Sequence, residues 1–315
     1  MIIHTGQRTD IPAFYTPWLM NRLREGYVLV RNPYDPSRVT RYELNPQVVD
    51  LMVFCTKNPR PMLPHLHMLA PYGQYWFVTI TPYGTELEPC VPPKEQVMED
   101  FRQLSRRVGA HRTAWRYDPI LLWQDWTVEK HLESFSQMAA GLEGYTRTCV
   151  ISFIDLYEKV RRNFPELRPV SREDRLLLGR EMTNIARSRG MTLRPCAEGD
   201  ELAPFGADCS GCMSIPVYEE ALGCRLKPPR IVTNRPGQCA CHLTCDIGAY
   251  DSCGHLCRYC YANKSPEDVR RAMARHDPAS PFLIGHSLPG DVVHQPSQTS
   301  WKDPQLRMED LLSLP

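Results

Sequence analysis

Three cysteines near the end of the sequence have the residue type and spacing of a loop that binds an iron–sulfur cluster. Cys253, Cys257 and Cys260 are separated by three and then by two residues in the segment CGHLCRYCYAN. A cubane [4Fe–4S] cluster takes one thiolate per iron, so three cysteines leave one iron open. Gly254 gives the backbone the freedom that a tight wrap requires. Because an open metal position can take a substrate or a cofactor, as in catalytic zinc sites, the spacing predicts a reactive cluster.

Seven further cysteines lie between residues 196 and 245, where Pro, Gly and Cys dominate: Cys196, Cys209, Cys212, Cys224, Cys239, Cys241 and Cys245. Four thiolates in a segment without a hydrophobic core of its own suit a second [4Fe–4S] cluster or a structural zinc ion, and the absence of any metal is the third alternative. Cys209 and Cys212 are also spaced as a ligand pair. Cys55, Cys90 and Cys149 lie in or beside predicted strands, and we expect them to be inert buried thiols.

The composition indicates neither a membrane anchor nor a strongly charged partner. Lys and Arg total 37 against 36 for Asp and Glu, so the net charge gives no case for nucleic acid or an anionic membrane. No apolar run approaches the roughly 20 residues that span a bilayer. The N-terminal segment MIIHTGQRTD lacks the pattern of a secretory signal. We therefore expect a cytoplasmic protein whose thiols stay reduced.

Short apolar runs alternate with amphipathic segments along most of the chain. Near-continuous apolar stretches such as VVDLMVF and CVISFI are typical of parallel strands covered on both faces. Thr127, Ser171 and Ser265 have the sequence context of helix N-caps. About eight strand–helix units predict an α/β fold in the form of a (β/α) TIM-like barrel. The predicted strands are Ile2–Thr5, Tyr27–Arg31, Val48–Thr56, Tyr75–Thr81, Thr113–Tyr117, Cys149–Ile154, Thr192–Pro195 and Thr244–Tyr250.

Four segments follow from this alternation. The main part of the barrel is expected over residues 1–198 and the Cys-rich insertion over 199–243. The final strand, the cluster loop and a helix would complete the barrel over 244–275, and 276–315 would form a surface extension.

Charged residues at the predicted strand ends are the candidates for catalysis, because the mouth of a barrel carries its chemistry. These candidates are Lys57, Arg116, Asp118 and Glu198. The alternative is that they form a structural ion-pair network inside the barrel.

The triplet, with the aromatic Tyr259 before its last cysteine, resembles the CxxxCxφC signature of radical-SAM enzymes. The resemblance implies that the three cysteines hold a [4Fe–4S] cluster, that the open iron binds S-adenosylmethionine, and that Tyr259 packs near the adenine. In that superfamily, one electron from the cluster breaks a carbon–sulfur bond and yields a 5′-deoxyadenosyl radical. The radical then abstracts hydrogen from a substrate.

The position of the triplet departs from the usual order of that superfamily. There it follows the first strand of the barrel, whereas here it follows the last predicted strand. NPYDP at 32–36 and TKNP at 56–59 look like downstream segments of the spore photoproduct lyase-like branch. Together these observations favour a circularly permuted radical-SAM barrel.

The whole chain, from RTDIPAFY through WRYDPILL and ISFIDLY to YCYAN, resembles the domain-of-unknown-function family 1848. This resemblance favours Cys196, Cys212, Cys239 and Cys241 as the ligands of the second site. No GGE segment follows a strand to hold the methionine amino group. Asp10, in the segment RTDIP, is the expected substitute, and a simple turn or ion pair is the alternative role for it.

We therefore expect a radical-SAM enzyme acting on an unidentified substrate, with a reducing electron donor such as flavodoxin or ferredoxin and no membrane partner. Two alternatives come from other classes: a zinc-stabilised binding protein, and an Fe–S electron-transfer protein that does not use S-adenosylmethionine. The second alternative needs a fourth ligand, such as Cys245 or His255. Nucleic acid stays open as a substrate, although a shared fold does not transfer a substrate.

Overall fold

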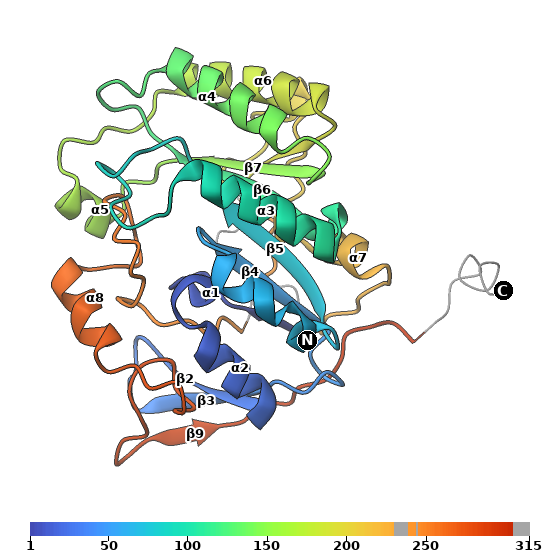
Figure 1. Cartoon of the computed structure of the whole chain (residues 1–315), viewed down its shortest axis with the longest axis vertical. Helices are drawn as coiled ribbons and strands as arrows, with labels where there is room; N and C mark the ends of the chain where they lie inside the picture. The colour runs from blue at the N-terminus through green and yellow to red at the C-terminus, as the bar shows by residue number, and fades with distance from the viewer. Residues whose placement is uncertain (230–238, 244, 305–315) are drawn as a thin grey trace.

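Six parallel strands form the central sheet in the computed structural model, which describes residues 1–229, 239–243 and 245–304 (Figure 1). The order across the sheet is β1-β4-β5-β6-β7-β8. The middle strands are buried along almost their whole length, as their continuous apolar sequence predicts. Their bounds are β1 Ile2–His4, β4 Leu51–Thr56, β5 Gly73–Thr79, β6 Thr113–Ile120, β7 Thr148–Phe153 and β8 Thr192–Pro195.

The segment that leads into the cysteine triplet lies beside β1. A parallel bridge joins His4 to Asp246. The Ile247 N–H donates to the His4 carbonyl at 2.9 Å, and the His4 N–H donates to the Cys245 carbonyl at 3.2 Å. A segment late in the sequence therefore lies at the edge of the sheet, next to its first strand.

The predicted closed barrel is not found among the described strands. They form an open sheet in which β8 has only β7 as a neighbour. β8 is four residues long and ends in Pro195, which has no N–H for a further ladder. Thr244, the first residue of the predicted strand Thr244–Tyr250, lies outside the described residues. The rest of that segment has only the bridge at Asp246, and Cys245 has a left-handed φ of 43°. The coarser expectation of an α/β fold with a parallel sheet is confirmed.

The helices connect and cover the strands (Figure 1). Thr127, Ser171 and Ser265 each accept a hydrogen bond from the backbone N–H three residues on, which confirms the three predicted N-caps. None of the described helices is both long and apolar enough to cross a bilayer. The α-helices are α1 Ile11–Phe14, α2 Thr16–Glu25, α3 Lys94–Val108, α4 Val128–Gly141, α5 Glu158–Asn163, α6 Arg172–Ser188, α7 Ile215–Leu222 and α8 Pro266–Met273. The 3-10 helices are η1 Arg60–Leu69, η2 Ala110–Arg112 and η3 Ala203–Phe205.

A second, smaller sheet lies apart from the central one (Figure 1). β2 (Tyr27–Arg31) pairs antiparallel with β3 (Arg38–Glu43), and β9 (Val292–His294) pairs parallel with β3. The Asn32 side chain accepts from the backbone N–H groups of Tyr34 and Asp35, which fixes the turn between β2 and β3. The predicted strand Tyr27–Arg31 therefore exists but does not belong to the parallel sheet.

The Cys-rich segment contributes to the main hydrophobic core, which differs from the expectation of a coreless insertion. Helix α7 packs beside β5, and its residues Val217, Tyr218 and Ala221 are buried in the cluster that contains the central strands. The segment after β9 is attached to the start of the chain, because the N-terminal ammonium of Met1 donates to the Thr299 carbonyl at 2.9 Å. The same ammonium pairs with Asp50 at 2.6 Å.

Candidate functional site

The cysteine triplet lies at the edge of the sheet where the parallel strands end. Asp10 follows β1, Lys57 follows β4, Glu88 follows β5, and the triplet follows the Asp246 bridge. Because the carboxyl ends of parallel strands share one edge, these side chains come from segments that meet there, and such an edge is the usual position of ligand sites in α/β proteins.

The three thiols of the triplet lie within electrostatic reach of one another. Burial raises the pKa of the Cys253 thiol well above its usual value, and Asp10, Cys260 and Cys257 raise it further. Burial raises the pKa of Cys257 to about 12 against the opposing effect of the Lys57 ammonium. The Ala262 N–H donates to the Cys260 sulfur at 3.4 Å. In the described part of the chain, no three His, Cys, Asp or Glu side chains are already arranged as ligands of a single metal ion.

The tight backbone turns of the triplet loop occur at residues other than Gly254, where they were predicted. Asp251 and Leu256, each with a φ of 56°, adopt the left-handed conformation, and Gly254 does not. Gly254 instead allows a close approach, since a Cβ at this position would lie 2.8 Å from a ring carbon of Phe14. The glycine is therefore required for packing against α1.

Asp10 fixes the triplet loop to the end of β1. One carboxylate oxygen accepts from the Ala13 N–H at 3.0 Å and so caps α1. The other accepts from the Lys57 N–H at 2.7 Å and contacts His255 Nε2 at 2.8 Å. His255 Nδ1 lies 3.3 Å from the Cys90 carbonyl, so both of its ring nitrogens have protein partners. These contacts are those of a turn and an ion pair, and the expected hydrogen bond from the methionine amino group to Asp10 stays a prediction.

A buried ion triad lies directly beside Cys257. The Glu88 carboxylate, 1% exposed, pairs with the ammonium groups of Lys57 at 2.8 Å and Lys94 at 2.5 Å. It also accepts hydrogen bonds from the hydroxyls of Thr81 and Tyr259. Burial raises the pKa of Glu88, but the two lysines outweigh burial and hold that pKa at about 2. One carboxylate between two ammonium groups leaves the triad itself with one excess positive charge, whereas the Asp10 carboxylate acts on Cys253.

Tyr259 is 7% exposed and packs in a second hydrophobic cluster with Tyr83 and Leu121. Its hydroxyl reaches Glu88, so the ring connects the triplet to the ion triad. Cys90, in contrast, is exposed, and the expectation that it is a buried thiol is wrong.

Two polar side chains that the sequence analysis missed lie close to the triplet. Asn263 donates through Nδ2 to the Cys253 carbonyl at 2.8 Å, but its Oδ1 is buried and has no hydrogen-bond partner among the described residues. The Nε2 atom of Gln7 is also buried without a hydrogen-bond partner among the described residues. The backbone carbonyl of Gln7 accepts a hydrogen bond from the Tyr261 hydroxyl. Buried polar atoms without partners are rare in folded proteins, so these two atoms are available for hydrogen bonds to a bound group. In the sequence, only its place as the polar residue directly after the last cysteine segment, in YCYAN, could have indicated Asn263.

The other charged candidates are Arg116 and Asp118, which lie within β6, and Glu198, which follows β8. Arg116 donates to Asp118 at 2.9 Å, and the Ser152 hydroxyl donates to the same carboxylate. Glu198 accepts from the Phe153 N–H at 2.8 Å and lies 3.6 Å from Arg175. Burial raises the pKa of Glu198 to about 7. Each of these charges has a protein partner, as in the structural alternative.

The four cysteines assigned to a second site converge on one another. The Cys212 and Cys241 sulfurs are 3.5 Å apart, and Cys196 forms hydrogen bonds with both. Cys239 hydrogen-bonds with Cys241. Cys209 does not belong to this group, because its thiol is directed to the Ala207 carbonyl.

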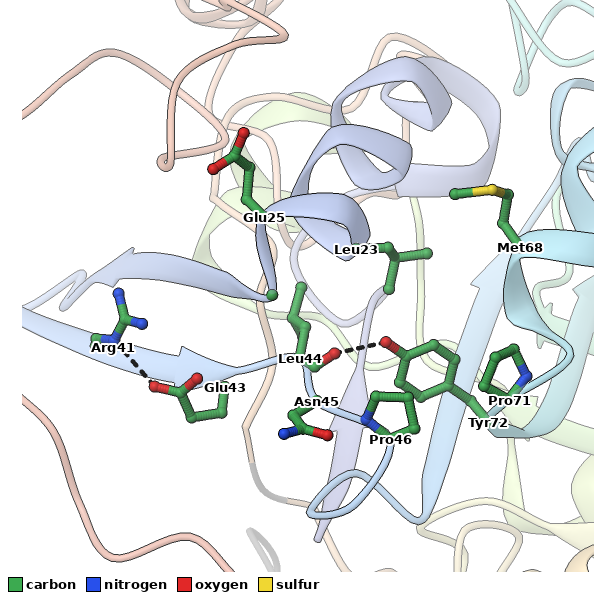
Figure 2. Close-up of a pocket in the computed structure, with 11 residues that line it drawn as sticks. Leu23, Glu25, Arg41, Glu43, Leu44, Asn45, Pro46, Met68, Pro71 and Tyr72 are labelled. Carbon is green, nitrogen blue, oxygen red and sulfur yellow. Dashed lines mark hydrogen bonds and ion pairs between the residues drawn. The ribbon is translucent and has the colours of Figure 1, made fainter.

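Two surface pockets lie away from both cysteine groups. Figure 2 shows a pocket of about 490 Å³ that includes the Arg41–Glu43 ion pair and the hydrogen bond from the Tyr72 hydroxyl to the Leu44 carbonyl. Its residues Pro46 and Tyr72 precede β4 and β5, so it lies at the amino ends of the strands. The other pocket lies between residues 274 and 288. Neither carries the chemistry described above.

Comparison with known proteins places the chain in one family. No curated protein matches the sequence. The model of the family described as "Domain of unknown function (DUF1848)" matches residues 2–262, from β1 to the residue after the YCY segment. Because the match covers most of the 315 residues, the chain belongs to this family.

Proposed function

We propose that this protein is a radical-SAM enzyme that holds a [4Fe–4S] cluster on Cys253, Cys257 and Cys260. The observation that carries the proposal is the convergence of three thiols in one loop at the carboxyl ends of parallel strands, with the Lys57 ammonium acting on Cys257. When bound, a cluster with an open iron and S-adenosylmethionine supplies a one-electron cleavage that generates a 5′-deoxyadenosyl radical.

The chain's own residues fit such a group. Lys57 and Lys159 favour the thiolate forms of Cys257 and Cys260, and the Ala262 N–H donates to sulfur. Hydrogen bonds to ligand sulfurs are a general means of stabilising such clusters. The unpartnered Asn263 Oδ1 and Gln7 Nε2 are placed to bind polar groups of the cofactor. Asp10 and Glu88 hold the loop in position through His255 and Tyr259.

The position of the loop supports a permuted order of strands. Across the sheet, the Asp246 segment lies at the edge beside β1, and β4, β5, β6, β7 and β8 follow β1 in that order. A triplet after the spatially first strand is the arrangement of radical-SAM proteins, with that strand moved to the end of the chain. The finer expectation of a permuted radical-SAM barrel therefore remains part of this proposal, as does a location in the reducing cytoplasm.

The electron-transfer alternative has less support. It requires a fourth ligand for the first cluster, and the sequence offered His255 or Cys245. Both ring nitrogens of His255 already have partners in Asp10 and Cys90. The Cys245 thiol hydrogen-bonds with Tyr42. An open iron is the arrangement that these contacts favour.

The test uses protein purified without oxygen, reconstituted with iron and sulfide, and reduced with dithionite. We expect 5′-deoxyadenosine to form from S-adenosylmethionine, and the Cys257→Ala variant to form none. Cys90→Ala is the matched control, because this thiol is exposed and lies in a segment that contacts the same loop. Zinc instead of iron at the triplet would refute the proposal and favour the zinc-stabilised binding protein.

A further inference from the structure

The Cys196, Cys212, Cys239 and Cys241 thiols form a compact group, which we name the thiol quartet. Its members come from the end of β8, from the loop before α7 and from the segment 239–243. Cys241 is central, since it hydrogen-bonds with the other three. None of these four cysteines is joined in a disulfide in the described structure. Thiols from three separate segments of the chain are thus brought together at one place.

Backbone donors around the quartet are directed at sulfur. The Met213 N–H donates to the Cys241 sulfur at 3.2 Å, and the Cys241 N–H donates to the Cys239 sulfur at 3.3 Å. Such N–H···S hydrogen bonds stabilise thiolates that are bound to metals and tune the bound metal. Neutral thiols are weak acceptors and give little reason for this arrangement.

Two further groups would stabilise bound thiolates, one by its charge and one by a hydrogen bond. An Arg116 guanidinium nitrogen lies 3.9 Å from the Cys212 sulfur. The Tyr218 hydroxyl lies beside Cys241 and Cys212, is completely buried and has no hydrogen-bond partner in the described structure. A buried hydroxyl that lacks a partner is destabilising, and a thiolate ligand or inorganic sulfide would give it an acceptor.

We propose that the thiol quartet binds a second metal centre through four thiolates, independently of the cysteine triplet. Four sulfur ligands select zinc or an iron–sulfur cluster over harder cations. In a tetrahedral zinc site, Zn–S bonds of about 2.3 Å place neighbouring sulfurs about 3.8 Å apart, close to the 3.5 Å between Cys212 and Cys241. The thiols contact one another rather than surround a common point, so binding requires their side chains to rotate from thiol–thiol contacts into ligation.

The proposal is separable from the proposed function. The variant C253A/C257A/C260A removes every triplet ligand and leaves the quartet intact. We expect this variant, purified without oxygen, to retain either about one zinc or about four irons with matching sulfide per chain. Adding C212S/C241S to it should remove that metal, whereas adding Cys209→Ser, three residues from Cys212 but outside the quartet, should not. Zinc and iron are distinguished by elemental analysis and sulfide assay.

A folded triplet variant that contains neither metal, or an unchanged metal content after C212S/C241S, would overturn the proposal. Because the serine variants can fail to fold, thiol alkylation of the unmodified protein gives an independent test. Before metal removal, the partly exposed quartet thiols Cys196 and Cys239 should resist iodoacetamide, and after removal by a chelator and re-reduction they should react. The buried Cys149 should stay protected in both states, and the exposed Cys90 should react in both. Equal reactivity of Cys196 and Cys239 before and after metal removal would contradict metal binding.

Discussion

The Glu88→Gln substitution should destabilise the protein strongly, because the Glu88 carboxylate pairs with two buried lysines, Lys57 and Lys94. Its carboxylate is 1% exposed, and the side chains of Lys57 and Lys94 are 13% and 18% exposed. The folded pKa of about 2 lies below the unfolded value of 4.5. This difference corresponds to about 3 kcal/mol of stability at neutral pH. Leaving two buried ammonium groups without their carboxylate costs a similar amount, about 3–5 kcal/mol.

The assay is urea unfolding followed by circular dichroism under anaerobic conditions at several pH values. A depressed carboxyl pKa contributes stability above pH 4.5 and loses it as the pH falls towards 2. The difference between the wild type and Glu88→Gln should therefore be largest near neutral pH and shrink below pH 4.5. Glu99→Gln is the matched control: Glu99 is 42% exposed in its pair with Arg102, and because solvent screens such a surface pair its loss should change the unfolding free energy little. A cost for Glu88→Gln no larger than that of the control would refute this reasoning.

Three other predictions concern His131, Asp10 and Gly254. Burial lowers the pKa of His131 from 6.5 to about 4, so the wild type should lose about 3 kcal/mol between pH 7 and pH 4; a His131→Gln variant with the same pH slope of unfolding free energy would contradict this. Asp10→Ala removes the cap of α1 and the partner of His255 and should cost about 2–4 kcal/mol in urea unfolding; Asp10→Asn, which retains a cap acceptor, should cost less. Gly254→Ala places a Cβ against Phe14 and should cost about 1–3 kcal/mol and reduce the iron bound after reconstitution; normal iron content would show that this contact does not position the loop.

The parallel strands could be predicted because burial on both faces leaves a direct mark on the sequence. The segment Val48–Thr56 contains β4 (Leu51–Thr56), and Thr192–Pro195 matches β8. Barrel closure could not be predicted in this way, since it depends on how edge strands pair rather than on alternation along the chain. β9 also gave no signal, because its valines Val292 and Val293 are exposed.

The site was predictable only where neighbouring residues carried the pattern. The spacing of Cys253, Cys257 and Cys260 is local and can be recognised in the sequence. Asp10 contacts His255, which lies 245 positions further along the chain, and Glu88 contacts Tyr259, which lies 171 positions further along. No local pattern encodes such pairs, because they depend on which strand ends share an edge of the sheet.

The most direct test of the central claim is electron–nuclear double resonance on the dithionite-reduced protein, with S-adenosylmethionine labelled with ¹⁵N and ¹⁷O in its amino and carboxylate groups. If the triplet leaves one iron open to this cofactor, the spectrum of the cluster will show magnetic coupling to both labels, and the Cys257→Ala variant will show none. A reduced cluster at the triplet without coupling to either label would contradict the claim, because its fourth iron would then be closed to S-adenosylmethionine.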